Sequence, residues 1–284
     1  MNPSRFLIIG AKGQLGKALQ AKYPGAKAVD MDELDISDPM QLEAFDWSNV
    51  KVIFNAAAYT NVDGAETPKG RKAAQQANAT AVKNLTNIAI KSDITIVHIS
   101  TDYVFDGTKS PHTEDEAFSP LNVYGQTKAE GDQALAKVPK HYILRTSWVI
   151  GDGKNFVRTM LELGKKSVNP SVVSDQIGRL TFTSELVRAI NHLLSINAPF
   201  GTYNVSNDGT PVSWADITRV IFKEAGLKNT VTDVTTADYY KGKEDVAPRP
   251  LQSTLDLAKI KATGFTPHDW HDDLKSYIRK ELES

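Results

Sequence analysis

Two residues suited to proton transfer, Tyr124 and Lys128, lie four positions apart in the segment Asn122-Val-Tyr-Gly-Gln-Thr-Lys128. On an α-helix this spacing places both side chains on the same face, one above the other. An ammonium held near a phenol favours the phenolate, lowers the tyrosine pKa and prepares the hydroxyl to exchange a proton with a substrate oxygen. Taken alone, such a pair is more often a surface contact. The interpretation therefore depends on the elements that position it.

A glycine-rich turn near the N-terminus supplies the first of these elements. Phe6-Leu-Ile-Ile is a continuous apolar run, typical of a strand buried on both faces of a parallel sheet, and it leads directly into Gly10, Gly13 and Gly16. A helical pattern follows through Leu19. Strand, glycine turn and helix in this order favour a dinucleotide site, because the turn lets the backbone approach a pyrophosphate and the helix start presents free amides to it. The spacing is G-x-x-G-x-x-G, so an ordinary βα turn stays open as the alternative.

Further strands and helices alternate through the first half of the chain. We expect strands at 27–30, 50–54, 95–100 and 142–146, and helices at about 38–44, 71–91 and 124–136. This alternation predicts an α/β fold with a doubly wound, Rossmann-like parallel sheet. Ligands bind at the carboxyl ends of the strands in such sheets, where Asn55-Ala-Ala-Ala-Tyr59 and Ser100-Thr101-Asp102 emerge. His98, inside a strand, is interpreted as a hydrogen-bonded core residue.

From about Gly151 the pattern loosens into helical candidates at 155–164, 184–194, 213–225 and 270–282, with short β-like pieces such as 202–205. We therefore expect an NAD(P)-binding Rossmann-like domain at 1–150 and a smaller substrate-binding α/β part at 151–284, with the chain free to interleave between them.

Composition excludes several classes of protein. The 284 residues carry a net charge of -1, so there is no positive field for nucleic acid or an anionic membrane. No apolar stretch approaches the 18 residues of a membrane span, the N-terminus does not read as a signal peptide, and there is no cysteine for a disulfide or thiol nucleophile. We expect a cytoplasmic protein with neither nucleic-acid nor membrane partners.

The glycine spacing together with Thr101, Tyr124 and Lys128 resembles the extended short-chain dehydrogenase/reductase family over the first 150 residues. More narrowly, the whole chain is similar to the dTDP-4-dehydrorhamnose reductase family. The motifs that carry this similarity are Gly-Gln-Leu at 13–15, Asn55-Ala-Ala-Ala-Tyr-Thr-Asn-Val-Asp63, Ser100-Thr-Asp-Tyr-Val-Phe105, Leu121-Asn-Val-Tyr-Gly-Gln-Thr-Lys128, Arg145-Thr-Ser-Trp148, Ser174-Asp-Gln-Ile-Gly178 and Arg249-Pro250.

The resemblance implies an NADPH- or NADH-dependent enzyme that reduces the C4 keto group of dTDP-4-dehydro-L-rhamnose to dTDP-L-rhamnose, the last step of dTDP-rhamnose biosynthesis. It implies that Tyr124 protonates the carbonyl oxygen, that Thr101 donates a hydrogen bond to it, and that Lys128 lowers the Tyr124 pKa and fixes the nicotinamide ribose. The cofactor-binding residues it implies are Gly13, Gln14, Leu15, Asp30, Asp35, Ile36, Ala57, Ala58, Tyr59, Tyr124 and Lys128, beside Gly10 and Gly16 of the turn. Thr101, Asp102 and Trp148 would hold the nucleotide sugar, with Arg249 meeting a phosphate.

Cofactor choice is predicted to be dual. Lys12, just before the second glycine, favours NADPH by pairing with a 2′-phosphate, whereas Asp30 near the ribose favours NADH. Two positions depart from the family pattern. Ala18 replaces a glutamate that some members use to bind magnesium at a dimer contact, and Leu180 replaces the usual proline. A homodimer is possible, but its metal link is not expected.

Two alternatives stay open: another nucleotide-sugar epimerase or dehydratase, and an NADP-binding regulatory subunit of the methionine adenosyltransferase type. Tyr103 after Asp102 disfavours a dehydratase, and the joint presence of Thr101, Tyr124 and Lys128 disfavours a regulatory subunit. A further cluster contains metal-like residue types, but acids at a helix start are usually solvated, so we predict no metal there. Its members are His268, Asp269, His271, Asp272 and Asp273.

Overall fold

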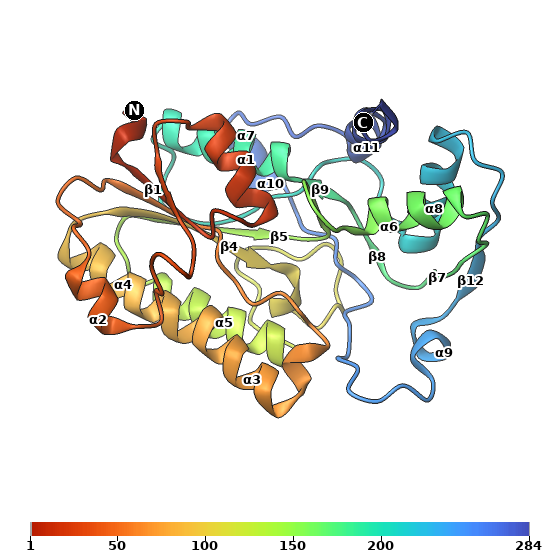
Figure 1. Cartoon of the computed structure of the whole chain (residues 1–284), viewed down its shortest axis with the longest axis horizontal. Helices are drawn as coiled ribbons and strands as arrows, with labels where there is room; N and C mark the ends of the chain where they lie inside the picture. The colour runs from red at the N-terminus through yellow and green to blue at the C-terminus, as the bar shows by residue number, and fades with distance from the viewer. Residues whose placement is uncertain (1, 284) are drawn as a thin grey trace.

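A six-stranded parallel sheet forms the centre of the protein, which we describe from a computed structural model over residues 2–283 (Figure 1). The strand order is β10-β5-β4-β3-β1-β2, and every neighbouring pair is parallel. The predicted doubly wound α/β fold is confirmed. The strands of this sheet are β1 (Phe6–Ile9), β2 (Lys27–Val29), β3 (Val52–Asn55), β4 (Thr95–Thr101), β5 (His141–Thr146) and β10 (Gly201–Asn204).

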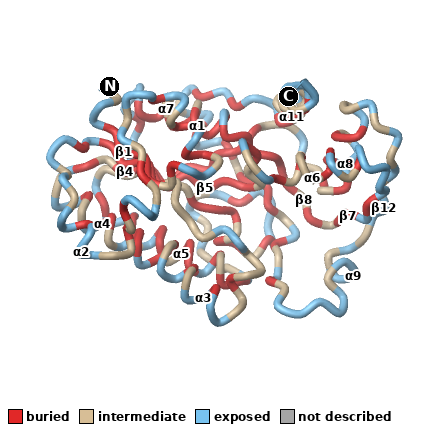
Figure 2. Tube along the Cα trace, in the orientation of Figure 1, coloured by how far each residue is buried: buried red, intermediate tan, exposed pale blue. Residues whose placement is uncertain are grey.

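Helices cover both faces of the sheet, which explains why its central strands are apolar throughout (Figures 1 and 2). On one face lie α1 (Gln14–Lys22), α7 (Thr183–Ser195) and α10 (Ala258–Ala262). On the other lie α2 (Pro39–Ala44), α3 (Pro68–Ala74), α4 (Ala81–Lys91) and α5 (Val123–Leu135). Each layer buries its own hydrophobic cluster against the strands. Short 3₁₀ turns occur at η1 (Pro3–Arg5), η2 (Gly64–Glu66) and η4 (Asp102–Val104).

The helix predicted at 71–91 begins three residues earlier and contains a π-helical segment, η3 (Gln75–Thr80), between α3 and α4. Such segments are rare and frequent at functional sites. Here the segment carries Asn78, which is fully buried and fastens the loop after β3: its amide oxygen accepts from the Tyr59 N–H at 2.9 Å and its amide nitrogen donates to the Tyr59 carbonyl at 3.1 Å. The same nitrogen donates to Thr127 Oγ1 on α5 at 3.2 Å. Asn78 therefore ties the loop to the helix that carries Tyr124 and Lys128.

The second half of the chain builds a smaller part and also returns to the sheet, because β10 pairs with β5 and α7 packs on α1. The smaller part has its own core. Its elements are β6 (Val149–Ile150), α6 (Phe156–Lys165), β7 (Ser171–Val173), β8 (Ile177–Gly178), β9 (Thr181–Phe182), β11 (Val212–Ser213), α8 (Trp214–Glu224), β12 (Thr232–Val234), α9 (Thr236–Tyr240) and α11 (Trp270–Glu283). The division into domains at 1–150 and 151–284, with the chain interleaving between them, stays a prediction. Within residues 2–283, no helix is long and apolar enough to cross a membrane.

The close approach of α5 to the π segment gives a test of this arrangement. A Cβ at Gly131 would lie 2.3 Å from the Asn78 carbonyl oxygen, so Gly131→Ala must push the two helices apart although alanine is the better helix former. We expect a loss of about 1–3 kcal/mol in the free energy of unfolding, measured by urea denaturation. Gly25→Ala is the control, since its added Cβ meets nothing closer than 3.6 Å. Equal stability of the two variants would contradict this packing.

Candidate active site

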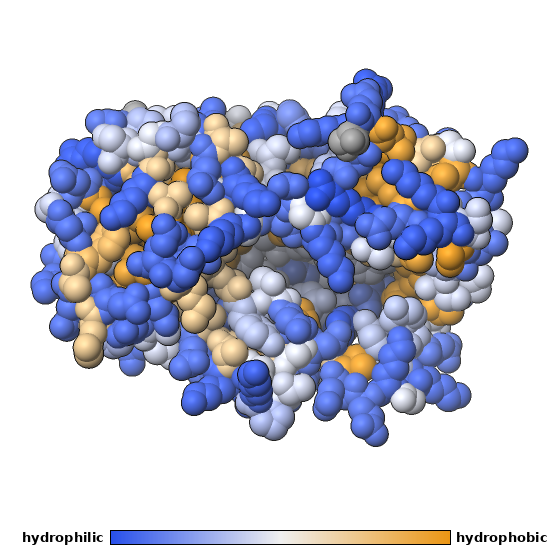
Figure 3. All heavy atoms as spheres, in the orientation of Figure 1, coloured by the Kyte–Doolittle hydropathy of each residue, from blue (hydrophilic) through white to orange (hydrophobic). Residues whose placement is uncertain are grey.

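A cavity of about 680 Å³ lies at the carboxyl edge of the sheet, where the larger and smaller parts of the molecule face each other. Figure 3 shows this face of the protein hollowed between the two parts. The cavity brings together residues that are far apart in the sequence. Those predicted for the site that line it are Lys12, Gly13, Gln14, Leu15, Ala58, Thr101, Asp102, Tyr124, Lys128 and Trp148.

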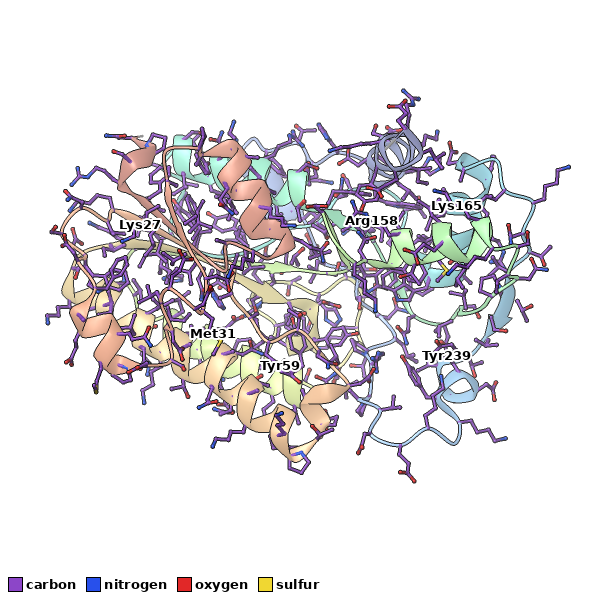
Figure 4. All side chains as sticks on the ribbon, viewed as in Figure 1. Lys27, Met31, Tyr59, Arg158, Lys165 and Tyr239 are labelled. Atoms are coloured by element: carbon purple, nitrogen blue, oxygen red, sulfur yellow. The ribbon has the colours of Figure 1, made fainter. Side chains whose placement is uncertain are left out.

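A second cavity of about 480 Å³ adjoins the first, because Lys12, Gly13 and Ala58 line both. The predicted cofactor residues that line it are Gly10, Lys12, Gly13, Asp30, Asp35, Ile36, Ala57, Ala58 and Tyr59. Met31 and Tyr59, labelled in the middle of Figure 4, also belong to this lining. The two cavities together extend from the β2 side of the turn to Tyr124.

The glycine turn has the geometry that a pyrophosphate site requires. Gly10 has a φ of +81°, and a Cβ on it would lie 2.7 Å from the Ala57 nitrogen. Gly16 does not line either cavity; a Cβ there would meet the Gly10 carbonyl oxygen at 2.1 Å, so it allows α1 to pack close to the turn. Gly13 is the N-cap of α1 and has no side chain to cap it, which leaves the first amides of the helix free for an anion. These residues fit a dinucleotide.

The two residues predicted to select the cofactor are both engaged near the turn. Asp30 accepts from the backbone N–H groups of Lys12 at 2.8 Å and Met31 at 2.9 Å. The Lys12 ammonium pairs with Asp32 at 2.7 Å, but both side chains are about two-thirds exposed. Exposed pairs contribute little. Lys12 is therefore free to exchange Asp32 for a phosphate, whereas Asp30 holds the turn in shape.

Tyr124 lies in the first turn of α5, whose N-cap Asn122 accepts from the Gly125 N–H at 2.8 Å. Its phenol is hydrogen-bonded with the Thr101 side chain at the end of β4. Burial is the largest effect on this group and raises the pKa of Tyr124 above its usual value. The net shift is opposite to the predicted lowering, because burial outweighs the Thr101 hydrogen bond and Lys128, whose ammonium is engaged elsewhere, is not among the groups that change this pKa here.

Lys128 is turned toward the sheet and is only 1% exposed. Its Nζ donates to the Ile99 carbonyl oxygen at 2.5 Å and lies 3.2 Å from His98 Nε2. Burial lowers the pKa of Lys128 to about 8, against the opposing effect of the Asp132 carboxylate. His98 is a fully buried, hydrogen-bonded residue of β4, as predicted, and it also forms part of the surroundings of Lys128.

Asp102 follows Thr101 and is 3% exposed. Its Oδ1 accepts from Thr101 Oγ1 at 3.0 Å, and Ser253 gives it a second hydrogen bond. Burial raises the pKa of Asp102 to about 6, partly offset by these hydrogen bonds. A hydrogen-bonded series thus runs from Tyr124 through Thr101 to Asp102. It fixes where the phenol points in the cavity.

Trp148 forms an aromatic wall of the cavity together with Trp214, a residue that sequence reasoning missed. The two rings stack with centroids 3.8 Å apart and an interplanar angle of 21°. Trp148 has a φ of +49°, an uncommon conformation for a bulky residue and one that often marks a functional position. Gly178 makes room for it, since a Cβ there would lie 2.9 Å from the indole. No spacing in the sequence connects position 148 with position 214.

Arg249 is the one predicted substrate residue that lies outside the lining of both cavities. Its guanidinium pairs with Asp63 at 2.8 Å and lies over the Tyr240 ring at 4.9 Å. Asp63 also accepts from the Ala247 N–H at 3.1 Å. In this structure Arg249 therefore joins the 235–249 segment to the loop after β3, and its predicted contact with a phosphate stays a prediction.

The cluster near the C-terminal helix is partly assembled. His268 and Asp273 meet the buried Glu185 with donor atoms within 4.8 Å of one another, whereas Asp269, His271 and Asp272 do not join them. Arg188 already pairs with the Glu185 carboxylate at 2.5 Å. The predicted absence of a metal stays a prediction.

A parallel doubly wound sheet, a glycine turn at its carboxyl edge and a buried Thr, Tyr and Lys set define the short-chain dehydrogenase/reductase class. Comparison of the sequence with family models is more specific: residues 4–283 match the RmlD substrate binding domain. The chain belongs to this family.

The chain is also similar to known proteins over almost its whole length. A dTDP-4-dehydrorhamnose reductase of Aggregatibacter actinomycetemcomitans is 40% identical, covering 96% of this chain and 98% of its own. The structure of a dTDP-4-dehydrorhamnose reductase of Clostridium acetobutylicum superimposes with a TM-score of 0.89 at 36% identity, covering 98% of this chain and 99% of its own. The structure of a Bacillus anthracis dTDP-4-dehydrorhamnose reductase in complex with NADP superimposes with a TM-score of 0.88 at 34% identity. The match covers 98% of this chain and 99% of that one.

The raised pKa of Asp102 predicts a pH-dependent stability effect. Folding favours the protonated carboxyl, so this residue costs stability as the pH rises from its unfolded value of 3.8 to about 6, and the cost is constant above that. The Asp102→Asn variant has no carboxyl group at this position, so it does not lose stability in this way as the pH rises. Relative to the parent, the variant should gain about 2 kcal/mol in free energy of unfolding between pH 4.5 and pH 7, measured by urea denaturation at both values. A difference independent of pH would contradict the shifted pKa.

Proposed function

We propose that the protein reduces the C4 keto group of dTDP-4-dehydro-L-rhamnose with NADPH or NADH, giving dTDP-L-rhamnose as the last step of dTDP-rhamnose biosynthesis. The observation that carries the proposal is the buried Tyr124, Thr101 and Lys128 set, in a cavity that adjoins the one beside the glycine turn. Relatives named as this reductase, alike over almost the whole chain, support the substrate.

The site suits an enzyme that works as an acid in the direction of reduction. When bound, a reduced nicotinamide would supply hydride to the carbonyl carbon, so that negative charge would grow on the carbonyl oxygen. Tyr124 gives its proton to this oxygen, and burial helps because it keeps the phenol protonated beforehand. Lys128 supplies positive charge to the phenolate that remains. Thr101 stays in contact with the phenol and donates to the substrate oxygen once its hydroxyl turns from Asp102.

Substrate contacts are assigned by position in the cavity. The stacked Trp148 and Trp214 rings offer an apolar surface for a deoxysugar face. Asp102, a largely ionised carboxylate at neutral pH, is an acceptor for sugar hydroxyls. We keep Arg249 as the donor for a nucleotide phosphate, which requires release of its pair with Asp63.

The first test mixes the protein with NADPH or NADH and dTDP-4-dehydrorhamnose. Oxidation of the cofactor is measured as the loss of absorbance at 340 nm. Replacing Tyr124 by Phe removes the proton donor and keeps the ring, so kcat should fall by about 10²-fold or more, whereas NADPH affinity should fall much less because the other predicted cofactor contacts remain. Calorimetric titration with NADPH measures the affinity.

Three other outcomes would count against the proposal. Unchanged turnover in Tyr124→Phe would remove Tyr124 from the reaction. Binding of NADPH without oxidation would favour a regulatory subunit of the methionine adenosyltransferase type. Turnover of another 4-keto nucleotide sugar in preference would assign a different substrate within the family.

Cofactor choice gives a second prediction. Lys12→Ala should raise KM for NADPH roughly tenfold and leave KM for NADH nearly unchanged, because the exposed ammonium has only the 2′-phosphate to distinguish the two cofactors. Initial rates with both cofactors measure the effect. Lys22→Ala, at the far end of α1, is the control and should alter neither KM. A parallel change in both KM values would show that Lys12 does not read the 2′-phosphate.

We place the reaction in the cytoplasm, where reduced nicotinamide cofactors are available. The homodimer stays a prediction.

A further inference from the structure

Behind the cavity, the Lys128 ammonium lies against a buried cluster of charged and titratable groups that have no part in the proposed mechanism. The cluster draws on three elements: Asp132 one turn along α5, His98 on β4 and Arg145 on β5, all 4% exposed or less. Charged groups are rarely buried so completely unless they pair with one another.

Asp132 is the carboxylate of this cluster. Its Oδ2 accepts from Ser100 Oγ at 2.9 Å and from Arg145 Nε at 3.3 Å. Its Oδ1 lies 4.0 Å from His98 Nε2 and accepts no hydrogen bond from residues 2–283. One oxygen is thus held by β4 and β5. The other oxygen lies on the His98 side of the cluster.

The charges in this cluster do not balance. Burial and the nearby Lys128 hold the pKa of His98 well below its usual value, so the imidazole is neutral. Lys128 and Arg145 are then two cations against one carboxylate. Burial raises the pKa of Asp132, whereas Arg145, Lys128 and the Ser100 hydroxyl favour its ionised form. Without Asp132, the buried Lys128 ammonium would face only neutral partners and a second cation.

The remaining titratable groups beside Lys128 cannot replace the negative charge of Asp132. Tyr124, one turn earlier on α5, stays protonated because its pKa is raised. Asp102, on η4, lines the same cavity, but it is engaged with Thr101 and Ser253. Of the groups that face it, the Asp132 carboxylate is the one whose effect supports the charged form of Lys128.

We propose that Asp132 is a positioning residue for the reaction: from the buried side of α5 it keeps the Lys128 ammonium charged and directed between the Ile99 carbonyl and the cavity. The proposal rests on the proposed reductase function. It adds that the reaction depends on a carboxylate that touches neither substrate nor cofactor. The expected signature is electrostatic, because a loss of packing alone would not change a titration.

The test compares pH profiles. In the parent, kcat/KM for NADPH should fall on the alkaline side with a midpoint near pH 8, where Lys128 loses its proton. Asp132→Asn keeps the shape and removes the charge, so the midpoint should move down by about one pH unit or more. Activity should then drop about five- to tenfold at pH 8 and at most about twofold at pH 6.

Two variants control for structure. Asp132→Glu restores the charge and should return the midpoint toward that of the parent. Glu185→Gln alters another fully buried carboxylate that pairs with an arginine, Arg188, away from Lys128, and should leave the midpoint unchanged. An equal loss of activity in Asp132→Asn at every pH, or a similar shift in Glu185→Gln, would overturn the proposal.

A second readout is independent of turnover. NADPH affinity measured by calorimetry from pH 6 to pH 9 should weaken at lower pH in Asp132→Asn than in the parent, because Lys128 is proposed to hold the nicotinamide ribose. If the parent protein binds NADPH but turns over no sugar, the result counts against the reductase function. The pH dependence of NADPH affinity in Asp132→Asn would still test the role of Asp132.

A measurement on the parent protein remains decisive if Asp132→Asn does not fold. The ¹³Cγ resonance of Asp132, assigned by NMR in labelled protein, should report an ionised carboxylate throughout pH 6 to pH 9. A protonated Asp132 at pH 7 would overturn the proposal.

Discussion

A lysine ammonium buried at the carboxyl edge of the sheet is the constraint on which the rest of this structure depends. Lys128 is held by one backbone carbonyl of β4, at residue 99, and by the neutral His98 ring beside it. Such a charge is costly to bury and survives only with partners. The neighbouring strands and helix supply them, and the same elements fix the direction of Tyr124. The chemistry of the site therefore depends on the packing of the elements behind it.

Helix α5 packs closely against the π-helical segment η3. Gly131 lets it approach the π segment, and Asn78 in that segment reaches both α5 and the loop at Tyr59. The loop lines the cavity beside the glycine turn, so the buried Asn78 amide couples the position of α5 to that of this cavity. The rare π-helical geometry thus occurs where it connects α5 with the lining of the cavity beside the glycine turn.

Much of this fold was predictable from the sequence, because its signals are local. Apolar runs, the turn at Gly10 and the Tyr124/Lys128 spacing each specify an element or a face within a few residues. What escaped prediction depends on contacts between distant segments. Nothing in the sequence shows that Trp214 stacks on Trp148, or that Arg249 closes on Asp63 instead of lining the cavity. The expected lowering of the Tyr124 pKa failed for the same reason, since burial is a property of the assembled site.

Direct titration of Lys128 tests the account at its centre. In protein labelled with ¹³C at the lysine ε-carbons, the Lys128 signal is assigned by its absence in Lys128→Met and followed from pH 6 to pH 11. We expect a midpoint near pH 8, because burial lowers the pKa of Lys128 and the Asp132 charge opposes that effect. A midpoint at the ordinary lysine value of 10.5 would mean that the ammonium is solvated, and it would contradict the buried charge from which the site is built.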